Sequence, residues 1–142
     1  MSKHDEESYM NHREADFTTL FRHWLRANPM PSAAFELKYS PTNALPFNGS
    51  SSVKPHQIDA LLAAQTKRGL LYKPPDDSRG VKPCDLLLVA NATSYVVICY
   101  PTEFHVIPIE SYVHEKESST RQSLTSERAR AIADISVITK AP

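Results

Sequence analysis

Apolar residues recur at helical spacing in three stretches of the chain. From about Tyr9 to Ala27 they form one stripe, and Asn28-Pro29 ends the helix that this stripe predicts. The stripe consists of Phe17, Leu20, Phe21, Trp24 and Leu25. A second helix is expected to begin near Pro55 and to end before Gly69, and a last helix to follow a Ser or Thr cap within 123–126.

Shorter apolar runs predict β-strands, because their residues alternate or run continuously over lengths typical of strands. They span Ser32–Ser40, Leu70–Lys73, Cys84–Ala90, Tyr95–Tyr100 and Phe104–Ile109. The third and fourth runs are almost wholly apolar, which predicts two strands covered on both faces and joined by a hairpin. The fifth run contains Pro108, which cannot donate to a ladder, so we expect it at a sheet edge.

Strands that alternate with helices predict an α/β domain with a central mixed sheet flanked by helices. With 142 residues, the chain is expected to form a single domain that spans 1–142. The polar residues 1–8 and the charged stretch of about 114–122 are expected to be flexible. Pro41–Ser52 is rich in Pro, Asn and Ser and is expected to be a loop.

The composition excludes some classes of function. Lys and Arg together number 16, as do Asp and Glu, so only a local basic patch could attract nucleic acid. The few glycines exclude a Walker loop and a GxGxxG turn. No apolar stretch approaches the length of a membrane span, and the polar start MSKHDEES is not typical of a signal peptide. Cys84 and Cys99 lie in apolar stretches, so we expect buried free thiols in a reducing compartment, the cytoplasm.

Candidate chemistry begins on the strand expected at Ser32–Ser40. Because side chains alternate along a strand, Glu36 and Lys38 share one face with Ala34. In the plainer interpretation they form a solvated surface ion pair, worth about 0–1 kcal/mol. In the other interpretation they belong to a site that polar residues from elsewhere in the chain complete.

Three further polar residues have unusually apolar neighbours. Glu14 precedes Phe17 by three residues and so projects from the apolar face of its helix, unless the first turn is exposed. Gln57 borders the inner stripe of the second helix near its N-terminus, where it could also face water. Asp85 begins an apolar run, and it is either at a strand end in water or part of a site.

These residues suit a Mg²⁺-dependent phosphodiesterase, for which Mn²⁺ would serve as a substitute metal. A hard divalent ion takes oxygen ligands, usually one or two carboxylates together with water, and we expect Glu36 and Asp85 to bind it. Lys38 is expected to position the attacking water or to offset charge in the transition state. Gln57 could orient the water or a phosphate oxygen through its amide.

The sequence FELK, preceded by an acidic helix and followed by a helix that begins with HQ, resembles the PD-(D/E)XK nuclease superfamily. It is most similar to the small Holliday junction resolvase-like endonucleases of phages and other viruses. The stretches PHQIDALLAAQTKRG, KPCDLLLVANATSYVVICYP and SLTSERARAIA also resemble these proteins, so the resemblance runs loosely from about residue 14 to 138.

This resemblance implies a compact or rearranged variant of the restriction-endonuclease-like fold and an endonuclease for branched or structured DNA. It implies that Glu36 and Lys38 are the ExK pair. By the same resemblance, Gln57 is the glutamine of the following helix and Glu14 is the acid of the first helix.

One feature departs from the pattern of this family. Its members carry a metal-binding aspartate on a hairpin between the first helix and the ExK strand, but here only Pro29–Ala34 lies between them. Asp85 is the candidate replacement, and Asp76 and Asp77, in a loop, are the next choice. If none of these replaces it, the chain is a catalytically inactive relative that binds nucleic acid or a protein partner.

Basic residues cluster in the middle third of the chain and could follow a phosphate backbone, although solvated helix and loop positions would give the same pattern. They are Lys54, Lys67, Arg68, Lys73, Arg79 and Lys82. If junctions are the substrate, two symmetric cuts imply a homodimer, in the host-cell cytoplasm if the protein is viral. A third possibility is an interaction protein without a nucleic-acid role, in which Glu36 and Lys38 form only a surface pair.

Overall fold

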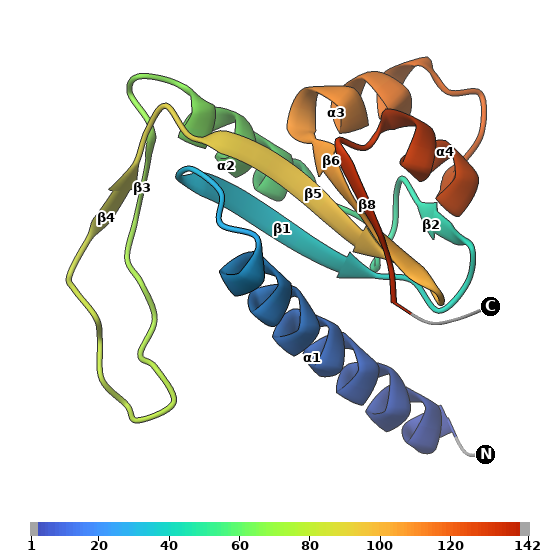
Figure 1. Ribbon diagram of the computed structural model, residues 1–142, viewed down its shortest axis with the longest axis horizontal. Helices are drawn as coiled ribbons and strands as arrows, with labels where there is room; N and C mark the ends of the chain where they lie inside the picture. The colour runs from blue at the N-terminus through green and yellow to red at the C-terminus, as the bar shows by residue number, and fades with distance from the viewer. Residues whose placement is uncertain (1–2, 140–142) are drawn as a thin grey trace.

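The computed structural model describes residues 3–139, with side chains described from Glu14 onward. Its centre is a four-stranded mixed sheet with the strand order β1-β5-β6-β8 (Figure 1). These strands span Ala33–Tyr39, Thr93–Cys99, Glu103–Pro108 and Ile135–Ile138. β1 runs parallel to β5, while β5–β6 and β6–β8 are antiparallel. The predicted α/β class with a mixed central sheet flanked by helices is therefore confirmed.

Helices cover both faces of this sheet (Figure 1). They are α1 (Lys3–Ala27), α2 (Pro55–Gln65), α3 (Ile109–Ser118) and α4 (Ser126–Ile132). Two small ribbons lie outside the sheet, β2 (Ala44–Pro46) with β7 (Ser123–Thr125), and β3 (Leu70–Tyr72) with β4 (Leu87–Val89). Within the described residues, no helix combines the length and the apolar character that crossing a membrane requires.

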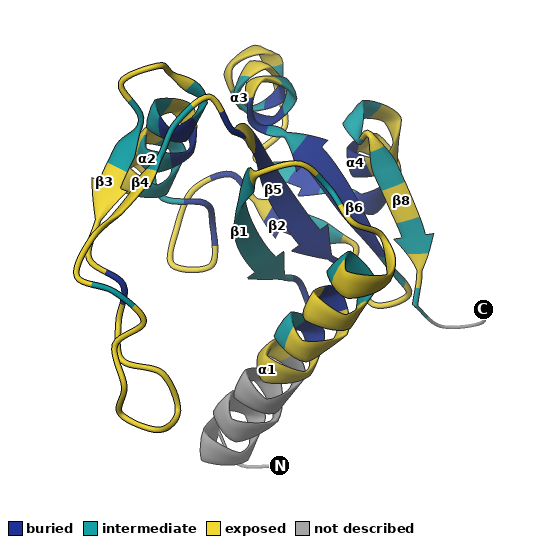
Figure 2. Cartoon of the chain, turned by 60° about the vertical axis from the view of Figure 1, so that its left-hand side comes forward, coloured by how far each residue is buried: buried dark blue, intermediate teal, exposed yellow. Residues whose placement is uncertain are grey.

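Alternation of side chains along β5 divides the core into two halves. Val96 and Ile98 point to the side where α2, α3 and α4 pack. Tyr95 and Val97 point to the opposite side, where they pack with Phe17 and Phe21 of α1. The central strands β5 and β6 are accordingly the most deeply buried part of the chain (Figure 2).

The spacing of apolar residues and the residues typical of element ends predicted α1, β1 and α2 well. α2 begins at Pro55, and Gly69 follows its end with a φ of 80°. α1 ends at Ala27 as expected, but it begins at Lys3, so 3–8 are helical where the sequence suggested flexibility. Residues 1–2 of that stretch lie outside the described residues.

The prediction of a buried strand over Cys84–Ala90 was wrong. β4 covers only its last part and pairs solely with β3, in an arm of about residues 70–90 that extends away from the sheet (Figures 1 and 2). The predicted hairpin with the next strand does not form, because β5 already has β1 on one side and β6 on the other. An apolar run alone does not tell a strand covered on both faces from an exposed one.

The prediction of an edge strand over Phe104–Ile109 was also wrong. β6 lies between β5 and β8, and Pro108 is its last residue, so the missing N–H falls where the ladder to β8 has already ended. The edge is instead formed by β8, which the sequence did not reveal.

The stretch 114–122, expected to be flexible, continues α3 as far as Ser118. Its Glu115 side chain is buried and paired with Arg128 of α4, which fixes this part of the chain. The expected loop Pro41–Ser52 contains the short strand β2, which pairs with β7.

Candidate active site

Glu36 and Lys38 lie together on β1, on the side of the sheet that α2 covers. Ala34, on the same face of the strand, packs against the core beneath α2. Lys38 Nζ lies 3.3 Å from Glu36 Oε1, and only 15% and 26% of the two side chains are exposed. The pair is therefore largely enclosed, which does not fit the interpretation of a freely solvated surface pair.

Gln57 reaches this pair from the first turn of α2. Its Oε1 accepts a hydrogen bond of 2.9 Å from the backbone N–H of Lys54, the residue that precedes the helix. Because an N–H group needs an acceptor, the amide atom of Gln57 that faces Lys54 is the oxygen, and the amide nitrogen points away from Lys54. Gln57 Nε2 donates to Glu36 Oε1 at 2.9 Å. The start of α2 thus fixes the orientation of a carboxylate on β1.

Both contacts use the same oxygen of Glu36. Lys38 and Gln57 approach Oε1, whereas no described residue contacts Oε2 through a hydrogen bond or an ion pair. A carboxylate that is held through one oxygen and open at the other is suited to bind a cation or a donor group of a ligand.

A cavity of about 370 Å³ opens beside this carboxylate, between β1, α2 and the base of the arm. Its lining is mainly apolar, and polar groups come from Glu36, His56, Gln57 and the hydroxyl of Tyr72. The complete lining is Ala33, Ala34, Phe35, Glu36, His56, Gln57, Ala60, Leu61, Leu70, Tyr72 and Val89. His56 is a neighbour of the site that sequence reasoning did not select, although it adjoins Gln57 directly.

The structure does not bring the predicted second acid to Glu36. Asp85 is exposed, lies just before β4 rather than at the start of a buried strand, and is absent from the lining of the cavity. Its side chain makes no hydrogen bond or ion pair with the described residues. Among these residues there is also no group of three or more His, Cys, Asp or Glu side chains arranged to hold a metal ion.

The alternative acids on the arm are likewise outside the cavity. Asp77 pairs with Arg79 at 2.8 Å and accepts the backbone N–H groups of Arg79 and Val81. The bonds from Arg79, followed by the backbone donors, lower the pKa of the Asp77 carboxyl. Asp76 is exposed.

Glu14 lies on the wrong side of the sheet to support Glu36 within one chain. It is exposed on α1, which packs through Phe17 and Phe21 on the face opposite α2. The four strands therefore separate the first helix from the face that carries Glu36.

The basic residues selected from the sequence are spread over α2 and the arm. Lys54 precedes α2, and Lys67 and Arg68 follow it, so the helix keeps the two groups on the order of 20 Å apart. Lys73, Arg79 and Lys82 are exposed on the arm. In sequence, Lys54, Arg68 and Lys73 each lie within two residues of a residue that lines the cavity, whereas Arg79 and Lys82 lie farther out on the arm.

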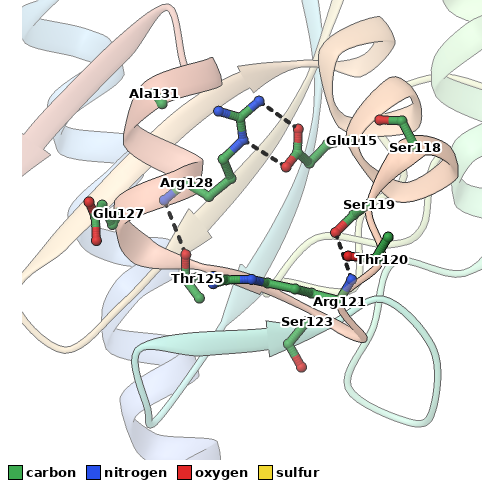
Figure 3. A pocket seen from close by; sticks show the side chains of 10 residues that line it. All are labelled: Glu115, Ser118, Ser119, Thr120, Arg121, Ser123, Thr125, Glu127, Arg128 and Ala131. Atoms are coloured by element: carbon green, nitrogen blue, oxygen red, sulfur yellow. Dashed lines mark hydrogen bonds and ion pairs between the residues drawn. The ribbon is translucent and has the colours of Figure 1, made fainter.

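Two polar clusters elsewhere were missed from the sequence. A cavity of about 510 Å³ between α3 and α4 contains Arg128, which binds Glu115 through two bonds of 2.7 and 3.1 Å (Figure 3). These bonds raise the pKa of the Arg128 guanidinium. Because both arginines of this cavity, Arg121 and Arg128, are balanced by Glu115 and Glu127, it does not concentrate charge of one sign.

The second cluster surrounds His105, which is fully buried in β6. Its Nδ1 lies 2.7 Å from Ser136 Oγ on β8, and its Nε2 lies 3.1 Å from Glu103 Oε1. Glu103 is also paired with Arg130 of α4, which neutralises its charge. The loss of hydration on burial therefore outweighs the attraction of Glu103 for a charged imidazole, and it lowers the pKa of His105 to about 4.

No protein-family model matches this chain, and no curated protein or solved structure is significantly similar to it. The function is therefore argued from the assembled residues themselves.

Proposed function

We propose that this chain is a metal-dependent endonuclease that hydrolyses phosphodiester bonds in branched or structured DNA, and that it is a rearranged member of the PD-(D/E)XK superfamily. The observation that supports this proposal is the contact of Gln57 with the Glu36–Lys38 pair, across 21 residues of sequence. The resemblance carried by FELK and by the following helix that begins with HQ implies that these same three residues share one site.

The arrangement of elements supports the same fold assignment. The strand with Glu36 and Lys38 leads into α2 with Gln57, and the chain then returns through β5, parallel to that strand. The arm of 70–90 is inserted between α2 and β5, and it carries Asp85, the candidate replacement for the aspartate of the family.

The residues of the site fit a Mg²⁺ ion, with Mn²⁺ as a substitute. Mg²⁺ is commonly bound through one or two carboxylates, with water and substrate phosphate as further ligands, and no described residue forms a hydrogen bond or ion pair with Glu36 Oε2. When bound, such an ion polarises the phosphate and lowers the pKa of a coordinated water. Asp85 would provide a second carboxylate if the arm moved toward β1.

Gln57, Lys54 and Lys38 have separate roles around this carboxylate. Gln57 holds Glu36 in one rotamer, and the cap at Lys54 holds Gln57. Lys38, mostly enclosed beside the carboxylate, is placed to orient an attacking water and to offset the charge that develops on the phosphate. If the substrate is a junction, two such sites in a homodimer would make the paired cuts.

A cleavage assay tests this proposal. Linear, nicked and four-way DNA are incubated with the protein and Mg²⁺ or Mn²⁺, beside Lys38→Ala and Glu36→Gln. We expect both variants to lose at least about 100-fold in cleavage rate, because each removes a group that acts on the reacting phosphate or its metal. Glu110→Gln is the matched control, since Glu110 also accepts a bond from a glutamine of α2, Gln65, but outside the site. Cleavage that persists undiminished in Lys38→Ala would refute the mechanism.

The second candidate is a catalytically inactive relative that binds nucleic acid or a protein partner through the same scaffold. It is favoured because, among the described residues, Glu36 is the only acid in the cavity lining. Tight binding of four-way DNA without cleavage in either metal, unchanged by Glu36→Gln, would support this candidate over the nuclease.

A further inference from the structure

Ser136 is an exposed serine whose hydroxyl lies against a buried histidine. It is on β8, opposite His105 of β6 in the ladder, so the two side chains lie on the same face of the sheet. Ser136 Oγ lies 2.7 Å from His105 Nδ1, and the other ring nitrogen, Nε2, lies 3.1 Å from Glu103 Oε1. Serine, histidine and carboxylate thus follow one another in the order that activates a serine nucleophile.

The partners of Glu103 decide which ring nitrogen of His105 carries the proton. The carboxylate is paired with Arg130, and its Oε1 also accepts a hydrogen bond from the hydroxyl of Ser126. Because a carboxylate can only accept, Nε2 of His105 is the protonated nitrogen and Nδ1 keeps a free electron pair. Nδ1 therefore accepts the hydroxyl proton of Ser136. Positive charge that forms on the ring during a reaction lies beside the carboxylate.

Burial keeps the imidazole in the form that accepts a proton. No part of the His105 side chain is exposed, and its pKa is lowered to about 4, so the ring is uncharged above about pH 5. Ser136, in contrast, is exposed on the last strand of the sheet, so a molecule from solution can reach its oxygen. The base is thus shielded from water while the hydroxyl that it can activate is accessible.

The backbone of Ser136 places a further donor at the open edge of the sheet. Just past β8, the N–H of Thr139 donates to the carbonyl oxygen of Thr102. Hydrogen-bonded positions recur every two residues in an antiparallel pair, and Ser136 is three residues from Thr139, so its own N–H points away from β6. No described strand pairs with β8 on that side (Figure 1). An N–H beside the nucleophile can bind the oxyanion that forms when an ester is attacked.

We propose that Ser136, His105 and Glu103 form a second site, in which Ser136 is a nucleophile toward activated carboxylic esters. Its Oγ attacks the carbonyl carbon while Nδ1 of His105 takes the hydroxyl proton. The bond from this carbon to the leaving oxygen then breaks, and the leaving oxygen receives the proton, which gives an alcohol and an acyl ester of Ser136. Water attacks the acyl carbon next and gives a proton to Nδ1, which passes it to Oγ as the carboxylic acid leaves.

The strength of the base selects the class of substrate. An imidazole with a pKa near 4 is a weak base, so it favours esters with a good leaving group over amides. This inference goes beyond the nuclease proposal and does not depend on it. β8 and β1 are the two edges of the central sheet, so Ser136 and the Glu36–Lys38 pair are far apart in the strand order.

Labelling of the full-length protein with a fluorophosphonate tests the inference. The probe forms a bond from phosphorus to a serine oxygen and releases fluoride, so mass spectrometry of peptides identifies the labelled serine. We expect labelling of Ser136, with a rate constant that falls by about 100-fold or more in His105→Gln, because this variant lacks the base. Ser123 of β7 is the internal control, since it is a strand serine that forms no hydrogen bond with a histidine in the described part of the chain. Equal labelling of the two serines, or an unchanged rate in His105→Gln, would overturn the inference.

The hydrolysis of p-nitrophenyl acetate provides a second measurement, which does not depend on the folding of His105→Gln. We expect the wild-type protein to release p-nitrophenol and Ser136→Ala to lose at least about 100-fold of this rate, because the nucleophile is missing. Ser123→Ala is the matched control and should retain the rate. Equal rates for the wild-type protein and Ser136→Ala would contradict the proposed site. No DNA is present in this assay, so its outcome does not bear on the nuclease proposal.

Discussion

At the scale of single residues, Gln57 connects the start of a helix to the chemistry of a strand. Its carbonyl oxygen accepts the N–H of Lys54, and its amide nitrogen donates to Glu36. One side chain therefore satisfies a free backbone donor of α2 and also fixes the carboxylate that faces the cavity.

Gln57→Met should reveal both roles, because methionine fills a similar volume without the two hydrogen bonds. We expect the free energy of unfolding to fall by about 1–2 kcal/mol and the cleavage rate to fall as well. Chemical denaturation and the DNA assay measure the two effects. Gln57→Glu keeps the acceptor for Lys54, so it should retain the helix start but place a second carboxylate against Glu36. Unchanged stability in Gln57→Met would contradict the capping role.

His105 makes the stability of the protein sensitive to acid. Its pKa in the folded chain, about 4, is below the ordinary value near 6.5. As the pH falls below 6.5, the unfolded chain takes up a proton that the folded chain does not, so stability is lost between pH 6.5 and about 4.

The expected loss from this one residue between pH 7 and pH 5 is about 2 kcal/mol. Urea denaturation at several pH values measures it, and His105→Gln, which cannot titrate, should show a correspondingly smaller loss. Parallel pH profiles for the two proteins would show that His105 does not cause the effect.

Alternation along a strand predicted that Glu36 and Lys38 share one face, and the resemblance of FELK and the helix that begins with HQ predicted that Gln57 joins them. Neither could place Glu14 and Asp85. The apolar stripe around Glu14 predicted a helix face but not which side of the sheet that helix covers. The apolar run after Asp85 predicted a strand but not whether the strand has neighbours.

At the scale of elements, the base of the arm depends on Gly69. Its φ of 80° is a conformation that residues with a side chain rarely adopt. A Cβ atom there would also lie 2.6 Å from the carbonyl oxygen of Val89 and 2.8 Å from the Cβ of Ala90. The turn after α2 and the return of the chain from β4 are therefore in close contact.

Gly69→Ala should destabilise the protein by about 2–4 kcal/mol, because backbone strain and a close contact with backbone atoms add together. Gly80→Ala is the matched control: its φ of 73° is similar, but no atom lies within 4 Å of the added Cβ. We expect it to cost only about 1–2 kcal/mol. Thermal denaturation of both variants measures the difference, and equal shifts would mean that the arm is not held closely at its base.

Elements with strong local determinants were predicted correctly, and those that depend on partners were not. Pro55 and Gly69 delimit α2 in the sequence as they do in the structure. β8, four residues long, contains only a weak alternation, and it forms because the exposed edge of β6 accepts it. No pattern within residues 135–138 indicates that β6 has an open edge.

At the scale of the whole molecule, two pairs of basic residues lie on opposite sides of the central sheet. Lys67 and Arg68 lie at the end of α2, while Arg22 and Arg26 are exposed on α1, across the sheet. If DNA approaches the cavity beside Glu36, the first of these two pairs lies on the side from which it comes, and the second does not.

The salt dependence of DNA binding tests this geometry. Replacing Lys67 and Arg68 together by Ala should weaken binding and reduce the slope of log K against log salt by about 2, because each phosphate contact contributes about 1. Replacing Arg22 and Arg26 by Ala is the matched control and should leave the slope unchanged. A larger change in the control would place the DNA on the face of α1.

The pairing of β1 with β5 also has a consequence for how the protein acquires its structure. Ala33 lies beside Thr93, so β1, which carries Glu36 and Lys38, cannot pair with β5 until the ribosome has added 60 further residues. Contacts between such distant parts of a chain form slowly, because a long loop must close before they gain any free energy. The glutamine of α2 can meet the carboxylate and the lysine of β1 before that, but the four-stranded sheet is complete only after β8, which ends at Ile138, has been added.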